Sequence, residues 1–369
     1  MKILILANND VGLYKFRREL LYELLKKHVV YIALPNGEFI KKLEDIGCKY
    51  IDIEFNRRGT NPLHDLKLIQ NYMSLIKKIK PDLVITYTIK PTLYGGIVCR
   101  LKKTNYIVNI TGLGTAVEKS GVLQKLILQM YKISLKKVVC VFFQNKSNMD
   151  FFYSRKLIKA KSRLIPGSGV NIAEHSFEEY PETEQCADKF LFIGRIMKDK
   201  GIEELFEAAK KIKQEYPKVS FDIVGGSDED YFSEIDSLEQ RGIIKYWNQQ
   251  SNVHKFLKSC NAVILPSYHE GMANVLLEAS STGRPVLASK IPGCTETFDE
   301  GITGFGFEVK DAEDLYCKIR KFVQLSYEKK IKMGISARKK MINEFNRQRV
   351  VDAYIEEIKK LEDKGNAIV

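Results

Sequence analysis

The chain has 369 residues, of which 44% are hydrophobic and 28% charged, so it is not a disordered polymer and is long enough for two domains with separate cores. No apolar run reaches the ~18 residues that a membrane-spanning helix needs. The seven cysteines form no C-x2-C pair, which argues against a disulfide framework or zinc site and favours a reducing cytoplasm.

The net charge of +13 is unevenly distributed along the chain. Residues 1–170 hold 30 basic and 12 acidic side chains, whereas residues 171–369 have a small acidic excess. Such a basic half suits an anionic membrane surface or a nucleic acid. The sequence contains no nucleic-acid-binding module and no alternation of basic and aromatic residues, so we expect no nucleic-acid partner.

The first half of the chain predicts alternating strands and helices. Apolar runs predict strands at 2–7, 29–33, 49–53, 82–86, 106–110 and 138–143. Helical periodicity predicts helices at 16–25, 38–46, 63–79, 92–101 and 123–135. Strands separated by helices favour a parallel, doubly wound sheet.

A second alternation starts at Lys189. Strands are expected at 190–193, 219–224, 243–246, 262–265 and 285–288. Turn-forming residues at 166–171 and an acidic stretch at 178–188 indicate the linker. We therefore predict an α/β fold of two Rossmann-like domains with parallel sheets, at 1–170 and 171–345, followed by a helical segment at 346–369.

The strand at 262–265 leads into a loop and helix that carry two glutamates. Gly271 permits a turn, and Asn274 is expected to cap the helix, so Glu270 lies in the loop and Glu278 inside the helix. Ligands of open α/β sheets bind at the carboxyl ends of strands. Carboxylates roughly 10 Å apart would match the span of a nucleotide-sugar. On their own, two solvated glutamates would give the same pattern.

A similar junction upstream carries two cations. The strand at 190–193 ends at Gly194, and Arg195 and Lys200 follow before a helical run that starts at Ile202. A helix N-terminus beside two cations suits phosphate groups. Either cation alone would be an ordinary solvated charge. Together with the two glutamates, they predict a site for a nucleotide diphosphate.

These two junctions resemble the donor site of the retaining GT-B glycosyltransferases of family 4, and the resemblance extends over nearly the whole chain. The segments Tyr-Thr-Ile-Lys-Pro at 87–91 and Thr-Gly-Leu-Gly at 111–114 further resemble bacterial polysaccharide and lipid-linked oligosaccharide transferases. The resemblance implies two Rossmann-like domains facing a cleft. It also implies that the final helix returns to the N-terminal domain.

The resemblance assigns roles to individual residues. It implies that Glu270 contacts the donor sugar, that Glu278 holds the ribose, and that Arg195 and Lys200 stabilise the diphosphate. Further substrate-binding residues are expected at Gly12, Lys90, Gly271, Met272, Ala273 and Asn274. Gly12 would allow close backbone approach, although a simple turn glycine is the competing interpretation. Lys90 stands in the loop where many family members have a histidine, and we expect it to take part of that role.

The segment Ser-Asp-Glu-Asp at 227–230 contains D-x-D, the metal signature of the other large transferase fold. Here it precedes an apparent helix, where acidic side chains complement the dipole. Because Arg195 and Lys200 already supply countercharge, we expect no metal ion and no cofactor apart from the UDP-sugar donor.

The resemblance implies a retaining hexosyl- or N-acetylhexosaminyltransferase that uses a UDP-sugar and a polyprenyl-diphosphate-linked glycan acceptor in surface polysaccharide or glycan biosynthesis. A UDP-sugar 2-epimerase of the same fold is the alternative, because the fold does not decide between them.

The segment 121–137 combines an apolar face with lysines, which suits both a helix on an anionic bilayer and an ordinary core helix. We expect a cytoplasmic protein peripheral to the inner face of the cell membrane.

Overall fold

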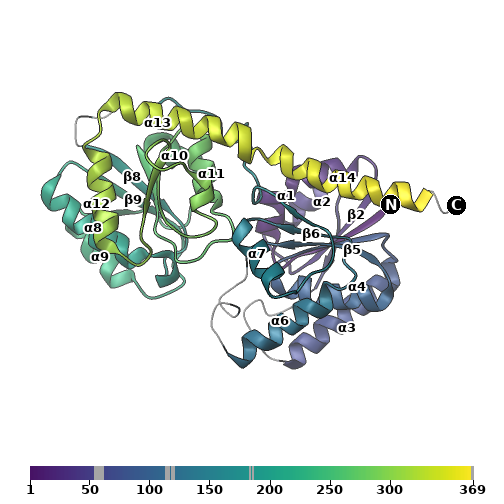
Figure 1. Ribbon diagram of the computed structural model, residues 1–369. Coiled ribbons are helices and arrows are strands. Elements are labelled where there is room, and N and C mark those ends of the chain that lie inside the picture. Colours follow the sequence, from purple (N-terminus) through teal and green to yellow (C-terminus); the bar gives the residue numbers. More distant parts are fainter. Residues whose placement is uncertain (54–61, 113–116, 118–120, 183, 185–186, 367–369) are drawn as a thin grey trace. The chain divides into compact units, whose positions relative to one another are not determined.

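The computed structural model describes residues 1–53, 62–112, 117, 121–182, 184 and 187–366 (Figure 1). The chain divides into two compact units, Met1–Ser168 with Arg347–Val369, and Gly169–Asn346. The chain thus passes between units after residues 168 and 346, beside the predicted limits of 170 and 345. The resembling segment at 111–114 lies partly outside the described residues.

The first unit is built on a seven-stranded parallel sheet with the strand order β3-β2-β1-β4-β5-β6-β7. Its strands are β1 (Lys2–Leu6), β2 (Val29–Leu34), β3 (Lys49–Asp52), β4 (Leu83–Tyr87), β5 (Asn105–Ile110), β6 (Cys140–Phe143) and β7 (Ser162–Leu164). Its helices are α1 (Asp10–Leu25), α2 (Ile40–Asp45), α3 (Pro62–Ile79), η1 (Pro91–Gly95), α4 (Gly96–Lys102), α6 (Val122–Ser134), α7 (Lys146–Ser154) and α14 (Arg347–Asn366).

Both faces of this sheet are covered, which explains the continuous apolar runs of its strands. Because side chains alternate along a strand, Ile3 and Ile5 pack into one core with α1 and α14, whereas Leu4 and Leu6 pack into another with α3, α4 and α6. Tyr354 of α14 is fully buried in the first of these cores. The final helix is therefore an integral part of the first unit.

The second unit contains a six-stranded parallel sheet with the order β10-β9-β8-β11-β12-β13. Its strands are β8 (Lys189–Ile193), β9 (Ser220–Val224), β10 (Lys245–Tyr246), β11 (Ala262–Leu265), β12 (Val286–Ser289) and β13 (Gly304–Phe307). Its longer helices are α8 (Ile202–Glu215), α9 (Phe232–Gln240), α10 (His254–Ser259), α11 (Asn274–Ser281), α12 (Ala312–Val323) and α13 (Tyr327–Lys340), and its short helical turns are η2 (Lys198–Lys200), η3 (Thr295–Thr297) and η4 (Met341–Phe345).

The acidic stretch at 178–188 is not a linker, because its described residues pack on the second unit. The Tyr180 hydroxyl donates to the carbonyl of Asn261, and the ring is largely buried. At the end of the stretch, Asp188 forms a buried ion pair with Lys330 of α13. The prediction failed here because acidic composition indicates a loop but not whether that loop is anchored.

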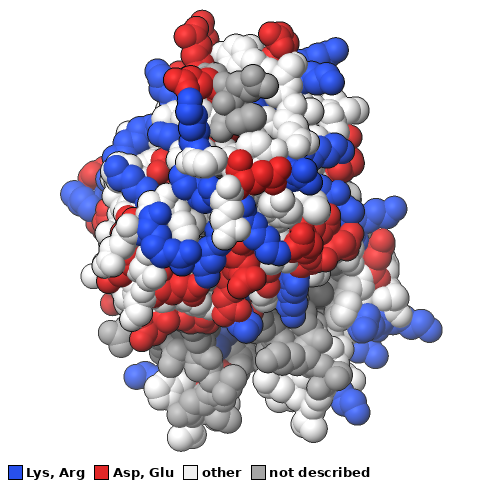
Figure 2. Space-filling model, turned by 90° about the vertical axis from the view of Figure 1, so that its left-hand side faces the viewer, with Lys and Arg blue, Asp and Glu red and all other residues white. Residues whose placement is uncertain are grey.

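The second unit has charges of both signs on its surface. Figure 2 shows Lys and Arg interspersed with Asp and Glu over the face that carries α8, α9 and α12. Ion pairs connect these helices, for example Arg320 with Glu215 at 3.0 Å and Lys210 with Glu234 at 3.1 Å. This mixed surface agrees with the small acidic excess of the second half. Within the described parts of both units, no helix has the length and apolar character to cross a bilayer.

Candidate active site

Two loops of the second unit meet because β8 and β11 are parallel neighbours. The backbone N–H of Tyr268 donates to the carbonyl of Asp199 at 2.9 Å, which joins the loop after β11 to the turn η2. Gly201 ends this turn at φ +69°, and a Cβ there would lie 2.0 Å from the carbonyl oxygen of Pro266. Glycine is therefore required for the close approach of the two loops.

The close approach brings Lys200 and Glu270 together. The Lys200 Nζ donates to the Glu270 Oε1 in an ion pair whose side chains are only 19% and 15% exposed. Gly293, at φ +86°, supports the other side of this loop, because a Cβ there would lie 2.7 Å from the carbonyl oxygen of Glu270. The site thus presents a cation and a carboxylate at the carboxyl ends of two adjacent strands.

Arg195 lies in the same loop as Lys200 but is about half exposed, and its guanidinium pairs with Asp228. The D-x-D segment precedes a helix, as predicted, but lies outside it, because α9 begins at Phe232 with Tyr231 at its N-cap. Asp228 instead provides the countercharge of Arg195. Among the described residues, no group of three or more His, Cys, Asp or Glu side chains is arranged to hold a metal ion.

The residues before α11 are mostly turned into the protein. Asn274 does not cap the helix as predicted; it is the first helical residue, and Ala273 occupies the N-cap without a side-chain bond. Ala273 donates its N–H to the carbonyl of Gly293 at 2.9 Å. The Met272 side chain is buried in a small apolar cluster with Leu277. The predicted substrate contacts of Met272 and Ala273 therefore cannot involve exposed side chains, whereas Gly271 is half-buried at the loop surface.

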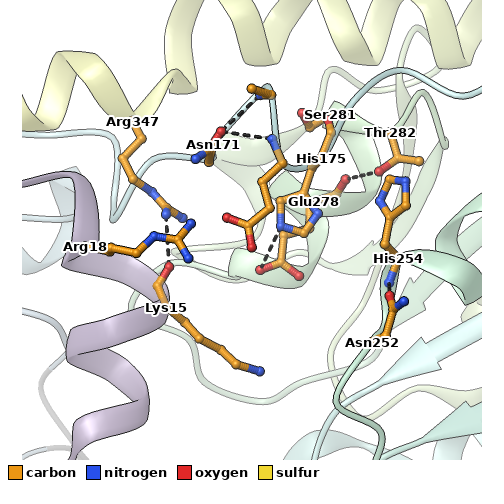
Figure 3. A network of polar contacts seen from close by, with 12 residues as sticks. Lys15, Arg18, Asn171, His175, Asn252, His254, Glu278, Ser281, Thr282 and Arg347 are labelled. Atoms are coloured by element: carbon orange, nitrogen blue, oxygen red, sulfur yellow. Dashed lines mark hydrogen bonds and ion pairs between the residues drawn. The ribbon is translucent and has the colours of Figure 1, made fainter. Parts of the chain in front are cut away.

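Glu278 lies in the middle of α11, as predicted, and a histidine from a distant part of the chain faces it (Figure 3). The His175 Nε2 is 3.9 Å from the Glu278 Oε1, and the two side chains are 12% and 17% exposed. The Glu278 carbonyl accepts from the Thr282 hydroxyl at 2.9 Å. Sequence reasoning did not identify His175, because no spacing rule connects it with Glu278.

The two predicted site residues of the first unit lie at the carboxyl edge of its sheet. Gly12 is in the first turn of α1 and not in a loop, because Asn9 caps a helix that begins six residues earlier than predicted. Lys90 forms an ion pair with Asp65 at 2.7 Å, and Asp65 also accepts from the Tyr94 hydroxyl at 2.7 Å. Part of the Lys90 charge is thus neutralised by the protein.

Cys294 lies close enough to Glu270 for the carboxylate to affect its ionisation. Burial raises the pKa of the Cys294 thiol well above its ordinary value, and the negative charge of Glu270 raises it further. The thiol is therefore protonated near neutral pH. This property argues against a thiolate nucleophile beside Glu270.

Two doubly wound parallel-sheet units, one of them with two cations and a carboxylate in the loops at its strand ends, are the architecture of the GT-B fold. The family model described as glycosyl transferases group 1 matches residues 178–340, and the one described as glycosyl transferase 4-like matches residues 2–145. The two matches together cover most of the chain. It therefore belongs to the glycosyltransferase family that these models describe, and the protein is a glycosyltransferase.

Curated relatives resemble most of the chain. The N,N'-diacetylbacillosaminyl-diphospho-undecaprenol alpha-1,3-N-acetylgalactosaminyltransferase of Campylobacter jejuni is 29% identical over 86% of this chain and 88% of its own length. The UDP-Gal:alpha-D-GlcNAc-diphosphoundecaprenol alpha-1,3-galactosyltransferase of Escherichia coli is 27% identical over 80% of this chain and 79% of its own length. These relatives are transferases, so they give the epimerase alternative no support.

Solved structures have the same fold. The Anabaena protein Alr3699/HepE, in complex with UDP and glucose, superposes with a TM-score of 0.78 at 17% identity and covers 98% of this chain and 100% of its own. A glycosyltransferase from Rickettsia africae has a TM-score of 0.77 at 21% identity and covers 98% of each chain. The predicted GT-B fold is confirmed.

Proposed function

We propose that the protein is a retaining transferase that moves a hexosyl or N-acetylhexosaminyl group from a UDP-sugar to a polyprenyl-diphosphate-linked glycan in surface polysaccharide or glycan biosynthesis. The pair of Lys200 and Glu270 carries the donor half of this proposal, because it sets a cation for phosphate beside a carboxylate for sugar hydroxyls. The acceptor half is supported by the relatives from C. jejuni and E. coli, whose names specify undecaprenol-diphosphate-linked acceptors.

Donor binding is assigned to the loops after β8 and β11. Lys200 and Arg195 contact the diphosphate, together with free N–H groups at the start of α8, since cations and helix N-termini both stabilise anionic oxygens. Glu278 accepts from the ribose hydroxyls. When Lys200 moves to the diphosphate, Glu270 becomes available for the hydroxyls of the donor sugar.

In the proposed reaction, the bond between the anomeric carbon and the diphosphate oxygen breaks while the acceptor hydroxyl oxygen bonds to the same face of that carbon. The acceptor proton passes to the departing phosphate. Arg195 and Lys200 stabilise the negative charge that develops on the leaving group. Glu270 stabilises the positive charge on the sugar ring. No covalent enzyme intermediate is needed.

Release of UDP should require both a suitable UDP-sugar and a lipid-linked acceptor. The experiment measures UDP release over a panel of UDP-sugars, with and without polyprenyl-diphosphate-linked glycans. We expect rapid release only when both substrates are present, with a glycosylated lipid as the second product. Equal release without acceptor, or appearance of an epimerised sugar, would contradict the proposal.

The same assay tests our proposal that the protein uses no metal cofactor. Asp228, the first acidic residue of the D-x-D segment, already pairs with Arg195, and the two proposed phosphate contacts are cations. We therefore expect unchanged transfer after treatment with EDTA and no gain from added Mg²⁺ or Mn²⁺. If transfer is lost in EDTA and fully recovered in Mn²⁺, the proposal is wrong and the D-x-D segment is the candidate metal site.

A membrane-facing surface is proposed on the first unit, at the start of α6. Val122 is 85% exposed, and Leu123 and Leu126 are also exposed, whereas Tyr131 and Ser134 at the other end of the helix are buried. The later part of the helix therefore contributes to the core, and the exposed apolar side chains at its start support the proposed membrane-facing surface.

Two further features support this surface. The lysines on α6 and directly after it are exposed: Lys125, Lys132, Lys136 and Lys137. Helix α3 contacts the same short helix, η1, as α6 does, and Leu63 and Leu66 near the start of α3 are exposed. Apolar side chains flanked by lysines suit the interface of an anionic bilayer, where the protein would meet a lipid-linked acceptor from the cytoplasmic side.

Binding to liposomes should depend on lipid charge. Each lysine near an anionic surface contributes about 1 kcal/mol, screened by salt within roughly 10 Å. We expect co-sedimentation with anionic liposomes at low salt and release at high salt. Replacement of Lys125, Lys132, Lys136 and Lys137 with glutamine should weaken binding without changing UDP affinity.

A matched control changes four exposed lysines of the second unit to glutamine: Lys211, Lys321, Lys329 and Lys332. This control has the same net charge as the α6 variant and should bind liposomes almost as the wild type does. Equal weakening in the two variants would show that net charge, and not this surface, controls attachment. Equal partitioning onto neutral and anionic liposomes would remove the electrostatic explanation.

A further inference from the structure

The turn that carries His175 is anchored to two helices of the second unit. The His175 carbonyl accepts from the Ser281 hydroxyl of α11 at 2.7 Å and from the Arg338 guanidinium of α13 at 2.9 Å. Its N–H donates to the carbonyl of Asn171 at 2.9 Å. The backbone of His175 is therefore held on both sides, which leaves only side-chain rotation to position the imidazole.

The imidazole is directed at the same face of α11. Glu278 and Ser281 are three residues apart and hence lie on one side of the helix. The Ser281 hydroxyl donates to the His175 carbonyl, and the His175 imidazole faces the Glu278 carboxylate, with 3.9 Å between the Nε2 and the Oε1 (Figure 3). Because both side chains are largely buried, solvent screens this contact only weakly.

We propose that His175 is a positioning residue for the donor nucleotide, and that it holds the Glu278 carboxylate in the orientation that accepts the ribose hydroxyls. The inference rests on the proposed function, which assigns the ribose contact to Glu278. A glutamate has three rotatable side-chain bonds, and its ordering on ligand binding opposes affinity. A carboxylate that is already oriented avoids this loss at the moment of binding.

A neighbouring histidine provides a matched control. His254 lies close to His175, with 6.1 Å between ring centroids, and is also partly buried. Its Nε2 is 3.1 Å from the Oε1 of Glu178 and not directed at Glu278. Replacement of His254 therefore removes an imidazole from the same region without removing the proposed contact.

The test compares UDP with 2′,3′-dideoxy-UDP, which lacks both ribose hydroxyls. Calorimetry measures both affinities for the wild type and for His175→Ala, Glu278→Ala and the double variant. We expect His175→Ala to weaken UDP binding about three- to tenfold, because the carboxylate must then be ordered by the ligand. Binding of dideoxy-UDP should be unchanged. The double variant should bind UDP no more weakly than Glu278→Ala alone.

Further variants separate positioning from a general effect on the fold. His175→Gln keeps an N–H donor near the Nε2 position and should recover part of the UDP affinity. His254→Ala should leave the ratio of the affinities for UDP and dideoxy-UDP at the wild-type value. Thermal unfolding of each variant shows whether the fold is retained. If His175→Ala does not fold, His175→Gln and the two nucleotides still provide the comparison.

Several results would overturn the inference. Equal loss for both nucleotides in His175→Ala would indicate a structural role, and additive losses in the double variant would separate His175 from Glu278. If Glu278→Ala itself fails to discriminate between the nucleotides, the ribose assignment of the proposed function fails and this inference fails with it. If Glu278→Ala discriminates and His175→Ala does not, only the role of His175 is wrong.

Discussion

Replacement of Lys200 with alanine is expected to lower kcat/KM for transfer about a hundredfold or more. A contact between a cation and a phosphate contributes about 1.5–3 kcal/mol, which corresponds to roughly tenfold to a hundredfold. The variant also loses the partner of Glu270, whose side chain is only 15% exposed. An uncompensated carboxylate at that position would repel the incoming diphosphate.

Second-site variants test this explanation. Glu270→Gln alone should bind UDP nearly as the wild type does and lower turnover, because its proposed role concerns the sugar. In Lys200→Ala, the further change Glu270→Gln should recover part of the UDP affinity, since it removes the repulsion. Arg195→Ala should have a smaller effect, about tenfold, because this side chain is half exposed and shared with Asp228.

Lys198 is the matched control, since it lies on the same turn, is largely exposed and pairs with Glu203 at 3.3 Å. Lys198→Ala should leave steady-state transfer and UDP binding unchanged. If Lys198→Ala and Lys200→Ala lower the rate equally, local charge and not a specific phosphate contact explains the loss. Unchanged kinetics in both Lys200→Ala and Arg195→Ala would reject the donor-site assignment.

The largest expected loss of stability follows from Lys330→Met. The Lys330 Nζ contacts both carboxylate oxygens of Asp188 at 2.8 Å, and the side chains are 6% and 1% exposed. Removal of one partner from a buried ion pair costs about 3–5 kcal/mol, because the other charge is left unpaired. We expect a loss of this size in the free energy of unfolding, measured by urea denaturation.

The pH dependence of this loss has a defined sign. Burial raises the pKa of Asp188, and contacts with Lys330 oppose that rise. Without Lys330, the folded-state pKa should rise further above its value in the unfolded chain, so the folded protein binds the proton more tightly. Stability of the variant relative to the wild type should therefore decline as pH rises from the pKa of Asp188 in the unfolded chain to its raised pKa in the folded variant. The deficit in the free energy of unfolding should be larger at pH 7 than at pH 4.

Two controls accompany this measurement. Lys332→Met changes an exposed lysine of the same helix and should shift the free energy of unfolding by less than about 0.5 kcal/mol. Adding Asp188→Asn to Lys330→Met removes the unpaired charge and should restore part of the stability. A variant Lys330→Met as stable as the wild type would show that the pair contributes little.

The sequence by itself determined the fold class. Strands buried on both faces are continuous apolar runs, so β1, β4, β8 and β11 were predicted within one or two residues. It also predicted that Arg195, Lys200 and Glu270 belong to loops at the ends of β8 and β11, because those loops follow directly from the strand limits. Strand β13 was missed, since its sequence, Gly-Phe-Gly-Phe, contains no β-branched residue.

Only the tertiary structure decided which charges meet. Lys200 pairs with Glu270, Arg195 with Asp228, Lys90 with Asp65, and His175 with Glu278. The members of each pair lie on different elements, and their distances depend on strand order and on how closely loops pack. Local sequence patterns report the period of a helix or strand and its caps, but they carry no information about such long-range neighbours.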